Sequence, residues 1–297
     1  MQNSQPRENK MGVMPVGRLI ITMALPMVIS MLIQALYNVV DSMFVSRIHE
    51  DALAAVSLAF PVQNLLIGLC TGTGVGVNAL LSRSLGERNF DEANRAARNG
   101  IFLAVLGWIA FLIFGIFGAR FFFSTQTANQ DIVEYGAEYL SLVTILSFGL
   151  FGEIILERLL QSTGKTFYTM LTQGAGAILN IILDPIFIFG YFGFPAMGVR
   201  GAALATVLGQ IVAMLLALIF NLKKNHEISL SPAGFRPSWR VIKTIYAVGL
   251  PSIVMMLVGS VMNYGMNQIL LGFTSTATAV FGVYFKLQSF VSCPCSA

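Results

Sequence analysis

Long apolar runs separated by short polar segments follow one another along the whole chain. A helix needs roughly 20 mostly apolar residues to cross the hydrocarbon core of a bilayer. Eight runs meet or approach that length, and the last of them is the shortest. They predict spanning helices over about 18–43, 54–81, 98–120, 134–156, 168–190, 198–222, 241–271 and 278–292. The pattern therefore predicts an all-α polytopic membrane protein.

Composition agrees with this pattern and excludes a soluble protein. Of the 297 residues, 56% are hydrophobic and only 11% are charged, whereas a soluble domain carries about 25% charged residues. The net charge of +4 would suggest nucleic acid in a soluble protein. Here the positive charges lie in the loops between apolar runs, so we expect no nucleic-acid partner.

The distribution of basic residues predicts the orientation of the chain. With the N-terminus in the cytoplasm, 14 of the 18 lysine and arginine residues fall in cytoplasmic segments. Outer segments then hold only Arg47, Arg120 and Arg200, and Lys286 falls within the eighth span. Because cytoplasmic loops are enriched in basic residues, we expect a multi-pass protein of the cytoplasmic (inner) membrane with a cytoplasmic N-terminus.

Two parts of the chain resemble each other at a constant offset of 225 positions. Leu25-Pro26 aligns with Leu250-Pro251, and Asn38 aligns with Asn263. Transporters are often built from such repeats. We therefore expect a six-helix N-terminal bundle over 1–222, a cytoplasmic linker over 223–240 that contains helix-breaking residues, and the first two helices of a repeated second bundle over 241–297.

The first span carries a polar stripe on one helical face. Gln34, Tyr37, Asn38 and Asp41 are spaced i, i+3, i+4, i+7. This spacing predicts that the four side chains line a cavity, although Asp41 could also mark the outer end of the helix. Pro26 lies upstream and removes one backbone hydrogen bond, so we expect the helix to bend there.

Other spans add polar groups that could face the same cavity. Asn180 and Asp184 are one turn apart and could share a cation or a proton, although Asp184-Pro185 could also mark a helix end. Thr206 gives the sixth span a polar position. Glu157 could line the cavity, but the adjacent Arg158 favours a charged rim at a cytoplasmic helix end.

Motifs of enzymes and cofactor sites are absent from the sequence. There is no GxxxxGK[ST] loop, no zinc spacing, and no plausible Ser-His-Asp arrangement. The glycines of 72–76 lie inside a span, where close helix packing explains them better than a phosphate loop does. We expect neither an enzyme nor a bound cofactor.

Several stretches together resemble the multidrug and toxic compound extrusion (MATE) family. They lie at 24–26, 41–46, 54–57, 82–89, 160–166 and 198–206. The resemblance implies twelve helices in two pseudo-symmetric bundles and export of small cationic amphiphilic drugs, driven by inward H⁺ or Na⁺. It further implies that Asp41, Asp184 and Asn180 bind the coupling cation, with Na⁺ as the one possible metal. A family asparagine expected near Glu157 is absent here. We expect a monomer in the lipid bilayer in which drug and ion compete for overlapping acids.

The last residues depart from the family pattern. The family continues with a sequence like Phe-Val-Phe-Met-Pro-Val-Phe-Gly, whereas this chain reads Phe-Val-Ser-Cys-Pro-Cys-Ser-Ala over 290–297. Loss of one nucleotide converts the first reading into the second, so a frameshift is our hypothesis and Cys293 and Cys295 are its product, not a metal site. The alternatives are a flippase for lipid-linked sugars from the same superfamily and a non-transporting membrane fragment.

Overall fold

The computed structural model describes residues 14–45, 50–127, 129–193, 195–228, 237–274, 277, 280–284 and 288, and these contain helices and no strand. The expected eighth span lies mostly outside the described residues, as do Arg47, Lys286, Cys293, Cys295 and the centre of the predicted linker. The all-α prediction is confirmed for the part that is described.

The helices match the first seven predicted spans, with ends that differ from the prediction by up to eight residues. Six are long and apolar enough to cross a bilayer, and a bent pair, α6 and α7, is a seventh candidate. The elements are α2 (Val16–Val45), α3 (Glu50–Gly86), α4 (Phe90–Phe117), α5 (Ala119–Gln126), α6 (Gln130–Ile145), α7 (Phe148–Ser162), α8 (Thr166–Phe189), η1 (Tyr191–Gly193), α9 (Val199–Lys224) and α10 (Trp239–Leu271). The chain is therefore a multi-pass membrane protein.

The fourth span differs from the expectation, because it is two helices bent by 45° at Leu146–Ser147. Side chains satisfy the backbone groups that the break exposes. The Ser147 hydroxyl donates to the Thr144 carbonyl at 2.7 Å, and the indole of Trp108 on α4 donates to the Ile145 carbonyl at 3.0 Å. Polar groups thus make the break tolerable at membrane depth.

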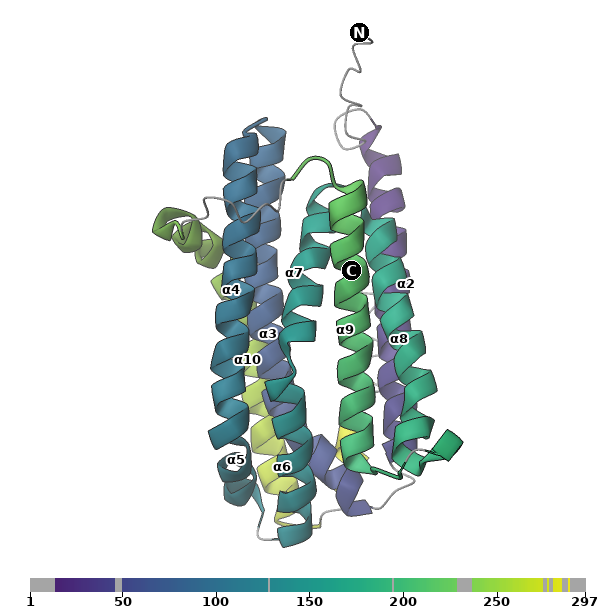
Figure 1. Ribbon diagram of the computed structural model, residues 1–297. Helices are drawn as coiled ribbons and strands as arrows, with labels where there is room; N and C mark the ends of the chain where they lie inside the picture. Colours follow the sequence, from purple (N-terminus) through teal and green to yellow (C-terminus); the bar gives the residue numbers. More distant parts are fainter. Residues whose placement is uncertain are drawn as a thin grey trace.

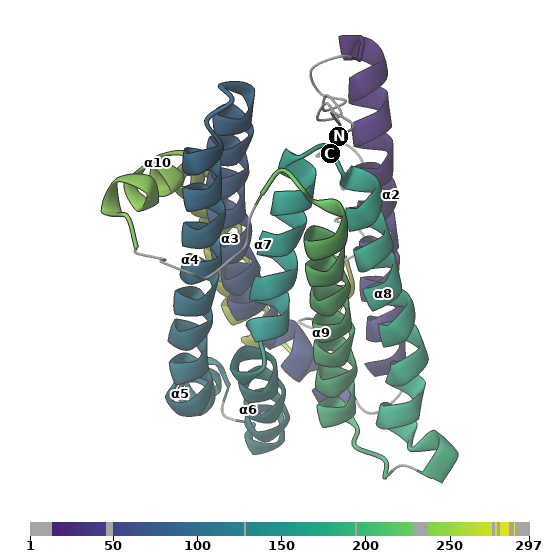
Figure 2. The same cartoon turned by 45° about the horizontal axis from the view of Figure 1, so that its top comes forward.

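The helices form two groups with α7 and α9 between them (Figure 1). On one side α2 packs along α8, and α8 packs against α9; on the other, α3 lies between α4 and α10. Figure 2 shows the same neighbours from a second angle. Contacts between α2 and α3 are sparse. A polar space can therefore open between the two groups.

Glycines hold α3 and α10 in close contact. A Cβ atom at Gly72 would collide with Ile253, one at Gly76 with the Ile245 carbonyl, and one at Gly249 with the Gly72 carbonyl. The two backbones therefore approach each other without side chains between them, as in small-residue packing of membrane helices. This confirms the packing interpretation of the glycines at 72 and 76.

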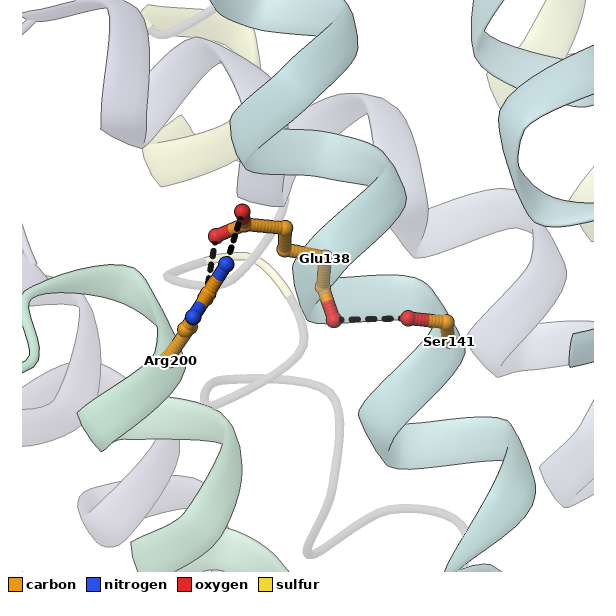
Figure 3. Close-up of polar contacts among 3 residues, drawn as sticks. All are labelled: Glu138, Ser141 and Arg200. Atoms are coloured by element: carbon orange, nitrogen blue, oxygen red, sulfur yellow. Dashed lines mark hydrogen bonds and ion pairs between the residues drawn. The ribbon is translucent and has the colours of Figure 1, made fainter. Parts of the chain in front are cut away.

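One end of the bundle carries an ion pair between α6 and α9. The guanidinium of Arg200 forms a forked interaction with both carboxylate oxygens of Glu138 (Figure 3). Ser141 donates to the Glu138 carbonyl at 3.1 Å. The turn from α5 to α6 and the segment 195–198 lie at this end, whereas the turns at 87–89 and 163–165 lie at the opposite end beside the start of α2.

Candidate functional site

A cavity of about 270 Å³ lies between α2, α7, α8 and α9, with α3 and α10 closing it on the other side. Five of the residues predicted to form a site line it: Gln34, Tyr37, Glu157, Asn180 and Thr206. Asp41, Asp184 and Asn38 are not among the lining residues. The arrangement therefore separates the predicted residues into a group at the cavity wall and a group behind it.

Glu157 lies in the wall formed by α7. It is only 3% exposed, so a charged rim at a helix end, which the sequence favoured, is wrong. Thr172 Oγ1 donates to one carboxylate oxygen and Gln173 Nε2 donates to the other, both at 2.7 Å. Both donors come from α8. The hydrogen bonds fix the direction of the carboxylate and join α7 to α8.

Two further charged residues of α7 line the cavity beside Glu157. Glu153 lies one turn earlier, and Arg158 is the next residue along the chain. The Arg158 guanidinium donates to Gln161 Oε1 at 2.7 Å. Within the described ranges no ion pair joins Arg158 to Glu157. With all three groups ionised, these residues give the wall a net charge of −1.

Asn180 and Asp184 form a second polar group on α8. With the amide oriented so that both of its atoms are satisfied, Asn180 donates to Asp184 Oδ2 and accepts from the Thr206 backbone nitrogen, both at 3.0 Å. Gly176 and Gly209 lie at the α8–α9 contact, where a Cβ atom on either would press against the other's backbone. This close approach lets the amide of Asn180 reach α9.

The Asp184 side chain is completely buried, and the residue lies within α8 and does not mark a helix end. The helix continues through Pro185 to Phe189, and Gly190 with φ of 75° ends it in the left-handed conformation. Within the described residues, Asp184 Oδ1 is a buried oxygen without a hydrogen-bond partner. Such an oxygen can accept a proton or a cation.

Asp41 lies one turn before the end of α2 and is 6% exposed. Because α2 packs along α8, its carboxyl group comes close enough to that of Asp184 for the two to repel when both are charged. Of the predicted group, Asn180 contacts Asp184 directly, with Thr206 beside it, and Asp41 lies on the adjacent helix α2. Nothing in the spacing of α2 alone could have shown this partner.

Of the remaining predicted residues of α2, some line the cavity and others do not. Gln34 and Tyr37 line the cavity. Asn38 donates its amide to the Gln34 carbonyl at 2.9 Å, within its own helix, and is not a lining residue. The helix runs unbroken through Pro26, whose carbonyl accepts from Ser30 Oγ at 2.9 Å.

The cavity also has an apolar wall that sequence analysis did not single out. Met27 and Met31 of α2 and Met256 of α10 line it. The spacing of Met27 and Met31 by one helical turn was visible in the sequence, but methionine in membrane helices usually only packs. Contact with Met256 depends on the α3–α10 packing, which no local pattern reveals.

The Glu157 and Asp184 carboxyl groups lie at different levels along the axis of α8. Gln173, which holds Glu157, and Asp184 are eleven residues apart on α8, close to three full turns. They therefore share a face of α8 and lie about 16 Å apart along its axis at 1.5 Å per residue. Within the described residues, no group of three or more His, Cys, Asp or Glu side chains could hold a metal ion. Carboxylate, amide and hydroxyl oxygens around Asp184 suit a hard monovalent cation or a proton.

Comparison with known proteins places these features in a family. The chain is 27% identical over 268 residues to the multidrug export protein MepA of Staphylococcus saprophyticus subsp. saprophyticus, covering 90% of this chain and 58% of the relative. It is 28% identical over 285 residues to a FAD transporter of Shewanella oneidensis, covering 93% and 61%. The chain thus spans about three-fifths of the length of these curated relatives.

A solved structure and a family model agree with these relatives. The structure of the MATE multidrug transporter DinF-BH, determined as a complex, matches with a TM-score of 0.90 and 30% identity, covering 97% of this chain and 65% of that one. The sequence model of the MatE family matches residues 26–186, more than half of the chain, from α2 to α8. The chain therefore belongs to the MATE family of multidrug efflux transporters.

Proposed function

We propose that this protein binds and exports small cationic amphiphiles across the cytoplasmic membrane in exchange for H⁺ or Na⁺. The chain spans about three-fifths of the length of its curated relatives. The proposal therefore has two parts that are tested separately, substrate binding in the cavity and coupled transport.

The observation that carries the proposal is the composition of the cavity wall. Glu153 and Glu157 of α7 contribute carboxyl groups to the lining, and Met27, Met31 and Met256 contribute thioether side chains. Methionine side chains adapt to apolar ligands of different shapes. A cavity lined by carboxyl groups and adaptable apolar side chains suits molecules that carry one positive charge on an apolar body.

Coupling is assigned to Asp41, Asn180 and Asp184. The two aspartates repel each other when both are charged, so a proton or Na⁺ at the pair would relieve that repulsion. Asn180 uses its amide to hold Asp184 against α9, and a Na⁺ ion would meet Asp184 Oδ1 first. Binding would then change the packing of α2 on α8, with Pro26 as the position where α2 bends.

Binding is tested with two ions of nearly the same shape and opposite charge. The purified chain in lipid nanodiscs is titrated with tetraphenylphosphonium and, separately, with tetraphenylborate, against protein-free nanodiscs. We expect saturable binding of the cation and none of the anion. Saturable binding of the anion alone would contradict the proposal.

Transport is tested in proteoliposomes that contain the same chain. Efflux of tetraphenylphosphonium should accelerate when an inward Na⁺ or H⁺ gradient is imposed, and the ion that accelerates it is the coupling ion. Saturable binding without gradient-driven flux would assign the chain to the alternative of a non-transporting membrane fragment and would overturn the transport part.

A second candidate is transport of an anionic substrate. A FAD transporter is among the relatives, and Arg158 lines the cavity. A flippase for lipid-linked sugars would likewise need basic groups for phosphates. Among the described lining residues, however, Arg158 is the one lysine or arginine, against the two glutamates Glu153 and Glu157, which favours the cation. Displacement of bound tetraphenylphosphonium by FAD would instead support the anionic substrate.

A further inference from the structure

Among the residues that the structure describes, Asp41, Asp184 and Glu157 are buried acids, and the proposed coupling function uses only the two aspartates. Asp41 and Asp184 lie behind the cavity wall, whereas Glu157 lies in it. Resting on the proposed export of cations, we propose that Glu157, held in position by Thr172 and Gln173, binds the positive charge of the substrate. This site is separate from the coupling-ion site, so substrate and coupling ion can be bound at the same time.

The geometry of the cavity separates Glu157 from the two aspartates. Glu157 is a lining residue, and neither aspartate is. Gln173 and Asp184 are separated by about 16 Å along α8. A charged group in direct contact with Glu157 is therefore several side-chain lengths from the aspartates. One small cation cannot contact both groups at once.

Two hydrogen bonds hold the Glu157 carboxylate in position. A carboxylate has about four acceptor positions. Thr172 takes one on the first oxygen and Gln173 takes one on the second. Both oxygens therefore keep capacity for a ligand, and their direction is fixed before the ligand arrives. Such preorganisation reduces the entropy that binding must overcome.

Arg158 could compete with a substrate cation for the Glu157 carboxylate. Arg158 is adjacent in sequence, but its guanidinium donates to Gln161, and no ion pair to Glu157 exists among the described residues. Glu153 lies one turn away and adds a second carboxyl group to the wall. The wall thus favours a cation, and Thr172 and Gln173 are positioning residues for its principal ligand.

The arrangement also identifies α8 as the element that connects the two sites. Thr172 and Gln173 hold Glu157, and Asn180 and Asp184 form the coupling group on the same helix. Gln173, Asn180 and Asp184 follow a spacing of i, i+7, i+11 on one face. Coupling would then pass through a displacement of α8 and does not need direct competition for one acid.

The test compares acid-to-amide variants for tetraphenylphosphonium binding in nanodiscs. Tetraphenylphosphonium has no hydrogen-bond donor, so a carboxylate attracts it by charge alone. A unit charge about 6 Å away at an effective dielectric constant of about 20 is worth about 3 kcal/mol, or roughly a 100-fold change in affinity. We expect Glu157→Gln to weaken binding by at least tenfold. Asp41→Asn and Asp184→Asn should change it by less than about threefold. Glu134→Gln, an exposed glutamate on α6 away from the cavity, is the matched control.

A positioning role is tested with Thr172. Thr172→Val removes the hydroxyl donor at nearly constant volume and should weaken binding several-fold, whereas Thr172→Ser should restore it. The Thr172 pair decides the question if Glu157→Gln does not fold. A structural role of Thr172 alone would lower thermal stability without the serine-specific rescue of affinity.

The way the affinity for tetraphenylphosphonium depends on the concentration of the coupling ion distinguishes separate sites from a shared one. With separate sites, rising Na⁺ concentration at constant pH, where Glu157 keeps its protonation state, changes the dissociation constant of tetraphenylphosphonium up to a plateau. With a shared site the constant rises without limit. Loss of binding in Asp41→Asn or Asp184→Asn with retention in Glu157→Gln would overturn this inference. Absence of saturable binding to the unaltered chain would overturn the proposed function itself.

Discussion

Buried polar side chains in this protein are held by the neighbouring helix and not only by their own. Asn221 on α9 donates to the Leu156 carbonyl of α7 at 2.9 Å, and Asn225 donates to the Leu159 carbonyl at 3.3 Å. Lys165 in turn donates to Asn225 Oδ1 at 3.2 Å. These contacts tie the ends of α7 and α9 together near the predicted cytoplasmic surface, on the cytoplasmic side of Glu157.

The proposed coupling group is the exception, because its two aspartates repel each other when both are charged. Asp184→Asn removes one of two mutually repelling carboxyl groups and keeps the size of the side chain. We expect the midpoint of thermal unfolding to rise by a few degrees in the absence of bound cation, as often happens when a strained functional site is neutralised. Fluorescence of Trp108 and Trp239 during heating measures this.

The same variant should lose any dependence of unfolding on Na⁺ concentration or pH that arises at this pair. The Glu134→Gln variant, exposed on α6, should keep both the midpoint and the ion dependence of the unaltered protein. A lower midpoint for Asp184→Asn would show that the carboxylate stabilises the fold, and would count against a strained ion site.

Residue spacing along single helices predicted which polar residues share a helical face. It could not predict the contacts that depend on packing between helices. The i, i+4 pair of Asn180 and Asp184 lies on one face of α8. Asn38 shares a stripe with Gln34 but satisfies its amide on the Gln34 carbonyl, an option that periodicity cannot exclude. Thr172 and Gln173 became partners of Glu157 only through packing of α8 on α7.

At the scale of the elements, hydropathy located the helices because each apolar run has to cover the bilayer. It did not predict the 45° break between α6 and α7. The signals for that break are single polar residues, Thr144 and Ser147, together with a distant tryptophan. After such a break the direction of α7 is no longer set by α6. Glu157, for which the adjacent Arg158 favoured a charged rim, instead lines the cavity, as the other interpretation predicted.

The α3–α10 contact gives a prediction for helix packing. In Gly249→Ala the new Cβ atom meets the Gly72 carbonyl, so one backbone must move. Overpacking of this kind typically destabilises by about 1–3 kcal/mol. Gly259→Ala adds the same methyl group on the same helix where nothing lies within 4 Å.

We therefore expect Gly249→Ala to unfold at lower temperature and Gly259→Ala to behave like the unaltered chain. Thermal unfolding in detergent, with limited proteolysis at the α9–α10 connection as a second readout, measures the difference. Equal stability of the two variants would mean that α10 is free to shift along α3.

At the scale of the whole molecule, the ends of the bundle differ in charge. The ends of α3 and α9 and the turns at 87–89 and 163–165, which carry Arg83, Lys224, Arg88 and Lys165, lie at the end where α2 begins. The starts of α5 and α9, which carry Arg120 and Arg200, lie at the opposite end. The helix arrangement therefore keeps the asymmetry that the sequence predicted. It supports a cytoplasmic position for the first end.

Orientation is measured by labelling single cysteines in intact cells. In a chain whose Cys70, Cys293 and Cys295 are replaced by alanine, Ala196→Cys and Glu87→Cys place exposed thiols at opposite ends. A membrane-impermeant maleimide should label Ala196→Cys directly and Glu87→Cys only after permeabilisation. The reverse pattern would place the N-terminus outside the cytoplasm.

The glycine-mediated contact of α10 with α3 also has a consequence in time. Gly72 and Gly249 are separated by 177 residues of chain, and ribosomes add about 5–20 residues per second. The glycine face of α3 consequently waits on the order of ten to thirty seconds in the membrane before its partner is synthesised. During that interval lipid or an insertion chaperone has to cover a surface shaped for another backbone. Assembly of this bundle is therefore most vulnerable while the ribosome translates α4 to α9, and slow translation there should lower the yield of folded protein without changing its final stability.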